Sequence, residues 1–175
     1  MFRLLTILAV CAAVAGAVVL RGRSASAPAG SAGCRFPLLE KLAVAVVWLS
    51  FATLAFTGFV GATLQGRALH GFWTLIHVTG GAAFAVSLTA LLLFRAEAYG
   101  FTPPGAAARF ATAQKACFWI IATCAVVLIL SIVLAMLRLI GTEGQHLAVQ
   151  IHRYSALIAL AAAILYAGAS ARAKA

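Results

Sequence analysis

Long apolar runs constrain this chain more than any other feature. A helix of about 20 apolar residues crosses the hydrocarbon layer of a bilayer. Hydrophobic residues make up 65% of the 175-residue chain and charged residues 9%, too few to cover a water-facing surface. Backbone groups in lipid must be satisfied within their own segment, so we expect each run to be a helix. The five expected spans are residues 4–20, 42–64, 69–94, 116–137 and 146–169.

The runs predict an all-α integral membrane protein in which one N-terminal transmembrane helix precedes a four-helix transmembrane bundle. We expect the N-terminal helix over residues 1–20, a linker over 21–41, the four-helix domain over 42–170 and a C-terminal tail over 171–175. The first run resembles a signal anchor, and a cleaved signal peptide is the alternative. Retention is favoured because Arg21 and Arg23 follow the run, whereas Arg3 alone precedes it.

The net charge of +10 predicts orientation in the membrane, not nucleic-acid binding. The basic residues stand singly in short loops and form no basic face on a soluble domain. Loops rich in Lys and Arg stay in the cytoplasm, so the N-terminus is expected outside. The side predicted to be cytoplasmic carries Arg21, Arg23, Arg35, Lys41, Arg95, Arg109, Lys115, Arg172 and Lys174, and the other carries Arg3, Arg67, Arg138 and Arg153.

The four histidines are the candidate functional residues, because ionisable groups inside membrane spans are costly and usually functional. His70 and His77 fall in the third expected span, and His146 and His152 in the fifth. Both spans start on the outer side, so they run in the same direction. His77 and His152 then lie about 10 Å below the outer surface. Two imidazoles at matched depth can bind one haem iron from opposite faces, which suits electron transfer.

Helical spacing separates the histidines further. His146 and His152 point about 120° apart, so one of them faces the third span, and we favour His152. His70 and His146 are expected at the wet interface or beside a quinone or partner site; a second haem held by this pair is the alternative. Gly80 and Gly81 lie one turn beyond His77, where they would admit a flat macrocycle or close helix packing. His77 and His152 would otherwise form polar contacts between helices.

Several chemistries are disfavoured. The four cysteines have no metal-ligand spacing and no haem-attachment motif, and the three acidic residues leave little for hydrolysis. Broken helices of a transporter are not expected, because all four prolines lie in loops.

Three sets of residues occur in order along the chain: His77, Gly81 and Arg95; Ala113, Gln114, Lys115, Phe118 and Trp119; and Ile151 with His152. This order of motifs resembles the cytochrome b (gamma) subunit of formate dehydrogenase and related membrane cytochromes b, over residues 35–168, with Ala113 in place of a glycine of the family. The resemblance implies a four-helix cytochrome b bundle in the bacterial inner membrane, with one periplasmic-side haem b on His77 and His152. It implies electron transfer between a periplasmic redox partner, such as a c-type cytochrome or iron–sulfur subunit, and the quinone pool.

The departures from that family concern its second haem. The positions corresponding to its ligands are Val44 and Tyr166, so the comparison implies loss of that haem. Arg153 and Arg67 are candidate partners of a haem propionate, or alternatively interfacial arginines that set the topology. We expect an electron-transfer subunit that is not catalytic alone. A haem-free structural or anchor subunit and a di-haem cytochrome b are the alternatives.

Overall fold

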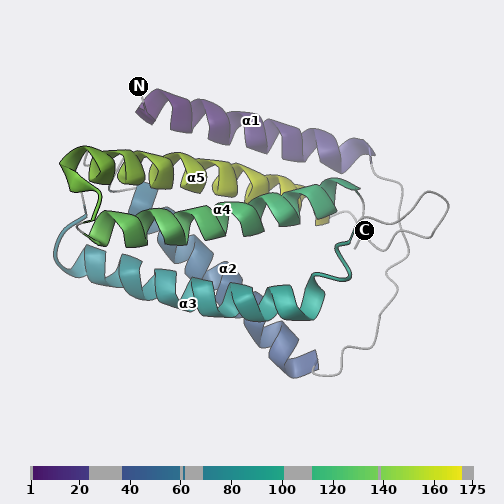
Figure 1. The fold of residues 1–175 in the computed structure, drawn as a ribbon. Helices are drawn as coiled ribbons and strands as arrows, with labels where there is room; N and C mark the ends of the chain where they lie inside the picture. Colours follow the sequence, from purple (N-terminus) through teal and green to yellow (C-terminus); the bar gives the residue numbers. More distant parts are fainter. Residues whose placement is uncertain are drawn as a thin grey trace. The chain divides into compact units, whose positions relative to one another are not determined.

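The computed structural model describes residues 2–23, 37–59, 61, 69–100, 112–137 and 139–170. In these ranges the chain forms helices and turns, with no β-strand, which confirms the all-helical prediction. Figure 1 shows the helices in chain order. They are α1 (Phe2–Arg23), α2 (Pro37–Phe59), α3 (Phe72–Arg95), α4 (Thr112–Met136) and α5 (Gly141–Ser170).

Four helices, α2 to α5, are long and apolar enough to cross a membrane. The chain is therefore a multi-pass membrane protein. The apolar part of α1, Leu4–Val18, is shorter. At 1.5 Å per residue it extends about 22 Å, against about 30 Å for a bilayer core. A fifth span thus remains a prediction.

The second helix begins earlier in the chain than predicted. It starts at Pro37, inside the stretch expected to be a linker, and extends to Phe59; the predicted end near residue 64 lies outside the described residues. Proline suits the first turn of a helix because its missing N–H would have no partner there. Glu40 also lies in the first turn, where a negative charge interacts favourably with the helix dipole.

The third helix begins later than predicted, which corrects the placement of His70. Gly71 precedes the helix with φ 57°, in the left-handed region that favours glycine. The helical repeat therefore begins only at Phe72, and His70 lies before the break. The expectation that His70 lies in the same helical span as His77 is wrong, because Gly71 separates His70 from the helix.

The last helix begins five residues earlier than predicted, at Gly141. The extra residues are mostly polar and include Glu143 in the first turn, so they extend α5 beyond its apolar part. His146 lies in this polar part and is exposed. His152 follows six residues later, shortly before the apolar run that begins at Ala156.

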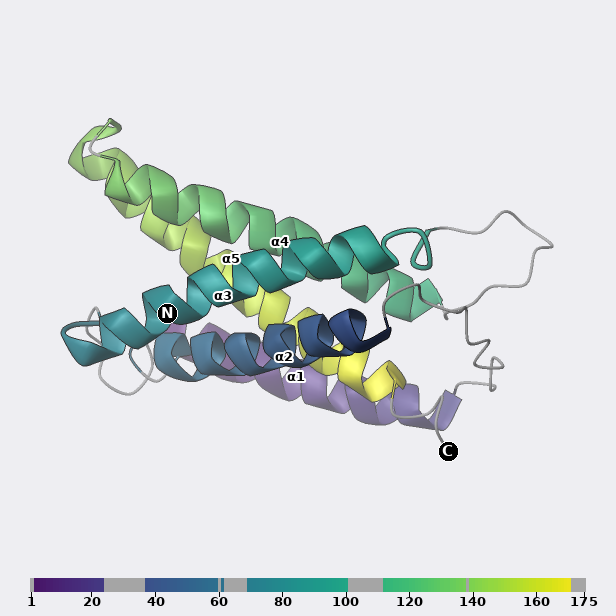
Figure 2. The same ribbon diagram turned by 90° about the horizontal axis from the view of Figure 1, so that it is seen from below.

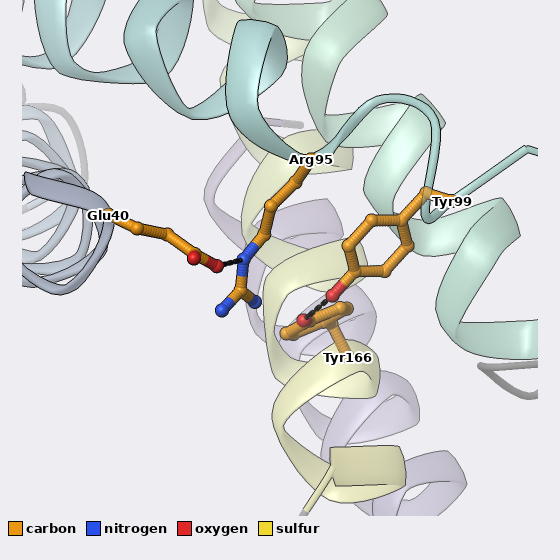
Figure 3. A network of polar contacts seen from close by, with 4 residues as sticks. All are labelled: Glu40, Arg95, Tyr99 and Tyr166. Carbon is orange, nitrogen blue, oxygen red and sulfur yellow. Dashed lines mark hydrogen bonds and ion pairs between the residues drawn. The ribbon is translucent and has the colours of Figure 1, made fainter. Parts of the chain in front are cut away.

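The helices form two compact units, of which the first contains α2 and α3. These two helices pack antiparallel. Glu40 at the start of α2 forms an ion pair with Arg95 at the end of α3 (Figure 3). Phe51 packs against Phe84 near the middle, with ring centroids 5.8 Å apart. Glu40 lies at the positive end of the α2 dipole and Arg95 at the negative end of the α3 dipole, so each charge interacts favourably with its own helix. The ion pair therefore stabilises the packing of α2 against α3.

The second unit contains α1, α4 and α5. Helix α5 contacts both of the others, and both views show it alongside α4 (Figures 1 and 2). Helices α4 and α5 are antiparallel, because Gln114 bonds to Ser170 while Ser131 lies beside His152.

Helices α1 and α5 run in the same direction. Phe2 packs edge-on against Tyr154, with ring centroids 5.7 Å apart. Further along, Ala17 approaches Gly168. The shared direction is the one that five alternating spans would give to α1 and α5.

The contact of α1 with α5 requires glycine at position 168. A Cβ there would lie 2.6 Å from Cβ and 2.8 Å from Cα of Ala17. We expect Gly168→Val to lower the free energy of unfolding by about 1–3 kcal/mol through overpacking. The matched control is Ala167→Val, since Ala167 is exposed. Thermal unfolding in detergent measures both, and equal melting temperatures would contradict the close α1–α5 contact.

Candidate functional site

His77 is held from α2 by a hydroxyl group. Its Nδ1 lies 2.7 Å from Oγ1 of Thr57, whose side chain is buried. The Thr57 hydroxyl donates its own proton to the carbonyl of Thr53, at 2.8 Å. With the hydroxyl proton on the Thr53 carbonyl, the Thr57 oxygen is an acceptor for His77, and this arrangement favours the tautomer that carries the ring proton on Nδ1. In the neutral imidazole the lone pair is then on Nε2.

Gly58 makes room for this imidazole. A Cβ at position 58 would lie 3.3 Å from Cε1 of His77, which is closer than the contacts that most Cβ atoms make in proteins. The absence of a side chain at Gly58 therefore lets the His77 ring lie against α2.

Gly80 and Gly81 face α2, one turn beyond His77. A Cβ at Gly80 would meet Leu54 and Thr53 at 3.7 Å, and one at Gly81 would meet Leu54 at 3.9 Å. Both are ordinary van der Waals distances. The packing of α2 on α3 therefore accommodates alanine at either position and does not explain two adjacent glycines.

Thr74 lies one turn before His77 on α3. Its Oγ1 is buried and has no hydrogen-bond partner among the residues that the structure describes. A buried hydroxyl without a partner is costly and calls for a polar group beside it. The vicinity of His77 thus contains a donor suited to a ligand oxygen.

His152 is held from α4 in a similar way. Its Nδ1 lies 3.1 Å from the carbonyl oxygen of Leu128 and 3.3 Å from Oγ of Ser131. A carbonyl oxygen only accepts, so Nδ1 of His152 must carry the proton. The neutral ring then has its lone pair on Nε2, as His77 does.

The two histidines share the chemistry of metal-binding imidazoles. Such ligands usually donate the other ring N–H to a carbonyl or hydroxyl group, which fixes the tautomer and ring orientation. Within the described ranges no group of three or more His, Cys, Asp or Glu side chains could hold a metal ion. A haem needs only two axial ligands from the protein, because the porphyrin supplies the other four. A histidine that donates from Nδ1 has the tautomer that such a ligand requires.

The other predicted site residues that the structure describes do not share the helix contacts of His77 and His152. His70 and His146 are exposed. Arg153 follows His152 on α5, but its guanidinium lies over the ring of Phe2 on α1, with Cζ 6.0 Å from the ring centroid. Arg67 lies outside the described residues.

A polar and aromatic cluster occupies the end of the second unit where Tyr166 stands. The Tyr166 and Tyr99 hydroxyls are hydrogen-bonded to each other (Figure 3). Tyr99 is 1% exposed and stacks on Phe118, with centroids 4.1 Å apart. Its carbonyl accepts from Nε1 of Trp119 at 3.1 Å, and Lys115 donates to the neighbouring carbonyl of Gly100 at 2.7 Å. The Tyr166 hydroxyl is thus bonded to a neighbouring tyrosine, and the surrounding polar groups are bonded to one another.

Sequence reasoning missed the roles of Thr57, Thr74 and Leu128. Hydroxyl residues are common in apolar helices, where they bond to the backbone one turn earlier, as Ser87 and Thr89 do here. Thr57 makes that bond as well, so its second contact, with His77, has no sequence signal. The Leu128 acceptor is a backbone carbonyl, which every residue carries.

Comparison of the chain with protein-family models, curated proteins and solved structures gives no match. The functional assignment therefore depends on the two histidines and their surroundings.

Proposed function

We propose that this chain is a membrane-bound b-type cytochrome subunit that carries one haem, with His77 and His152 as axial ligands. The observations that support it most are the hydrogen-bond contacts of Nδ1 in both rings, with Thr57 Oγ1 in one and the Leu128 carbonyl in the other. A ring that donates from Nδ1 carries its lone pair on Nε2, the nitrogen that would bind the iron. When bound, the haem iron takes up and releases single electrons.

The residues of the chain supply binding and environment. His77 and His152 provide the two nitrogen ligands, and Thr57 and Leu128 hold their rings. Two ligands of this kind leave no open iron position, so oxygen chemistry is disfavoured and electron transfer is favoured.

Other groups would anchor the edges of the macrocycle. The orphaned Thr74 hydroxyl can donate to a propionate oxygen. Arg153 and Arg67 are the proposed cationic partners of the propionates. Gly80 and Gly81 are only partly covered by α2, and the macrocycle would lie on the part of this glycine surface that α2 leaves exposed.

A haem-free structural or anchor subunit is the rival function. In that case the contacts of His77 and His152 with neighbouring helices would be their whole role. The buried Thr74 hydroxyl, which has no hydrogen-bond partner among the described residues, favours a bound group instead.

A second haem has less support. The exposure of His70 and His146, and the break at Gly71, disfavour a pair of buried ligands there. At the corresponding second-haem position of the resembled family, Tyr166 is bonded to Tyr99. We therefore propose a single haem per chain.

The proposed partners follow from the side of the membrane on which the haem lies. The charge bias places the His77 end of α3 outside, on the periplasmic face of a bacterial inner membrane. A periplasmic redox protein, such as a c-type cytochrome or an iron–sulfur subunit, would exchange electrons there. The quinone pool is the proposed second partner, within a larger oxidoreductase complex.

A reduced-minus-oxidised absorption spectrum of the purified chain tests this function. We expect a b-type α band that is lost in the double variant His77→Ala/His152→Ala. The matched control, His70→Ala/His146→Ala, should keep the band. A wild-type protein without the band would favour the haem-free structural subunit.

A further inference from the structure

Helix α2 contains no histidine, yet it contributes a residue to the ligand site. We propose that Thr57 is a positioning residue for the haem ligand His77: its hydroxyl accepts the Nδ1 proton and so presents the Nε2 lone pair to the iron. This inference rests on the proposed haem and assigns a role to a residue that has no metal-binding group of its own.

The direction of the hydrogen bonds supports this role. Thr57 Oγ1 lies 2.7 Å from His77 Nδ1 and 2.8 Å from the Thr53 carbonyl. The carbonyl can only accept, so a hydroxyl that donates to Thr53 directs its oxygen lone pairs toward His77. This relay from Thr53 through Thr57 to His77 favours the tautomer with the ring proton on Nδ1.

Burial makes the relay rigid. Thr57 is 2% exposed, so water does not compete for its hydroxyl. Gly58 follows it and leaves only the space that the His77 ring needs. A threonine in a helix also has a restricted side-chain torsion, which fixes the oxygen while it bonds to the preceding turn.

The hydrogen bond would also influence the iron. An imidazole that donates Nδ1–H to an acceptor is a more basic ligand. A more basic ligand stabilises the ferric state over the ferrous state and lowers the reduction potential. Hydrogen bonds around the ligands are among the means by which proteins set haem potentials. Loss of the Thr57 oxygen should therefore raise the potential.

The test compares Thr57→Val with Thr57→Ser in the full chain. Valine keeps the shape of threonine but removes the hydroxyl, whereas serine keeps the hydroxyl. We expect Thr57→Val to weaken haem affinity about 10- to 100-fold and to shift the midpoint potential upward. Thr57→Ser should restore both. The matched control is Thr53→Val, which removes a hydroxyl bonded to Leu49 and keeps the Thr53 carbonyl.

The outcomes separate this proposal from the function on which it rests. Wild-type affinity and potential in Thr57→Val would overturn the role of Thr57 and leave the haem assignment standing. Equal loss in the valine and serine variants would also overturn it, because the hydroxyl would not be the cause. A wild-type chain that binds no haem would overturn the proposed function itself.

A second measurement needs no variant. Nitrogen-15 NMR of the ring nitrogens in the full chain, labelled at histidine and purified before haem is added, reports the tautomer directly. We expect the His77 proton on Nδ1. A proton on Nε2 would overturn the proposal even if Thr57→Val failed to fold.

Discussion

We expect alanine at either His77 or His152 to abolish stable haem binding, whereas the same change at His70 or His146 should leave the haem in place. Each of the first two variants would remove one of the two proposed nitrogen ligands of the iron. His70 and His146 are exposed, so their removal should not disturb the site. Haem content per purified chain measures the effect.

The fold should survive the ligand variants. Without His77, the Thr57 hydroxyl still donates to Thr53, and the Glu40–Arg95 ion pair still joins α2 to α3. The lost hydrogen bond contributes about 0.5–1.5 kcal/mol to the free energy of unfolding. Helical content by circular dichroism and a single peak in size-exclusion chromatography verify folding. Loss of haem in His70→Ala with retention in His77→Ala would contradict the ligand assignment.

Adding one methyl group at Gly81 should lower haem affinity without destabilising the helices. A Cβ there meets Leu54 at 3.9 Å, an ordinary contact, so α2 accommodates it. Alanine also favours the helix by about 1 kcal/mol over glycine. If the macrocycle covers this surface, the methyl group displaces it. We expect Gly81→Ala to weaken haem binding about tenfold, equivalent to about 1.4 kcal/mol.

Two controls separate an effect of Gly81→Ala on haem affinity from an effect on the stability of the helices. Ala82→Gly changes the next residue, which is exposed, and should leave haem affinity unchanged. Thermal unfolding of haem-free protein should show that Gly81→Ala is at least as stable as wild type. Full haem affinity in Gly81→Ala would show that the macrocycle does not cover this glycine.

The helices were predictable from sequence because hydropathy dominates in lipid. Each of the five apolar runs corresponds to a helix in the described part of the chain, and α2 to α5 are long and apolar enough to cross a bilayer. Their ends were less predictable, because local backbone chemistry sets them. Pro37 starts α2 within a stretch that composition marked as linker, and Gly71 delays α3. A glycine in an apolar run gives no sign of whether it will take a positive φ.

The site was predictable only in part. Histidine is rare in apolar helices, so His77 and His152 could be selected from sequence. The groups that contact their Nδ1 atoms could not be selected. The Leu128 acceptor is a backbone carbonyl, and Thr57 does not differ in sequence from any other hydroxyl residue in a helix. The resemblance to a cytochrome family marked Tyr166 as a lost ligand, but only the fold shows Tyr99 bonded to it.

The haem-to-chain ratio of the purified wild-type protein tests the central claim most directly. A pyridine haemochrome assay measures haem b, and amino-acid analysis measures the chain. One haem b per chain is the predicted result, with His77 and His152 as its ligands. No haem would contradict the cytochrome assignment, and two would contradict the proposal that this chain keeps a single haem.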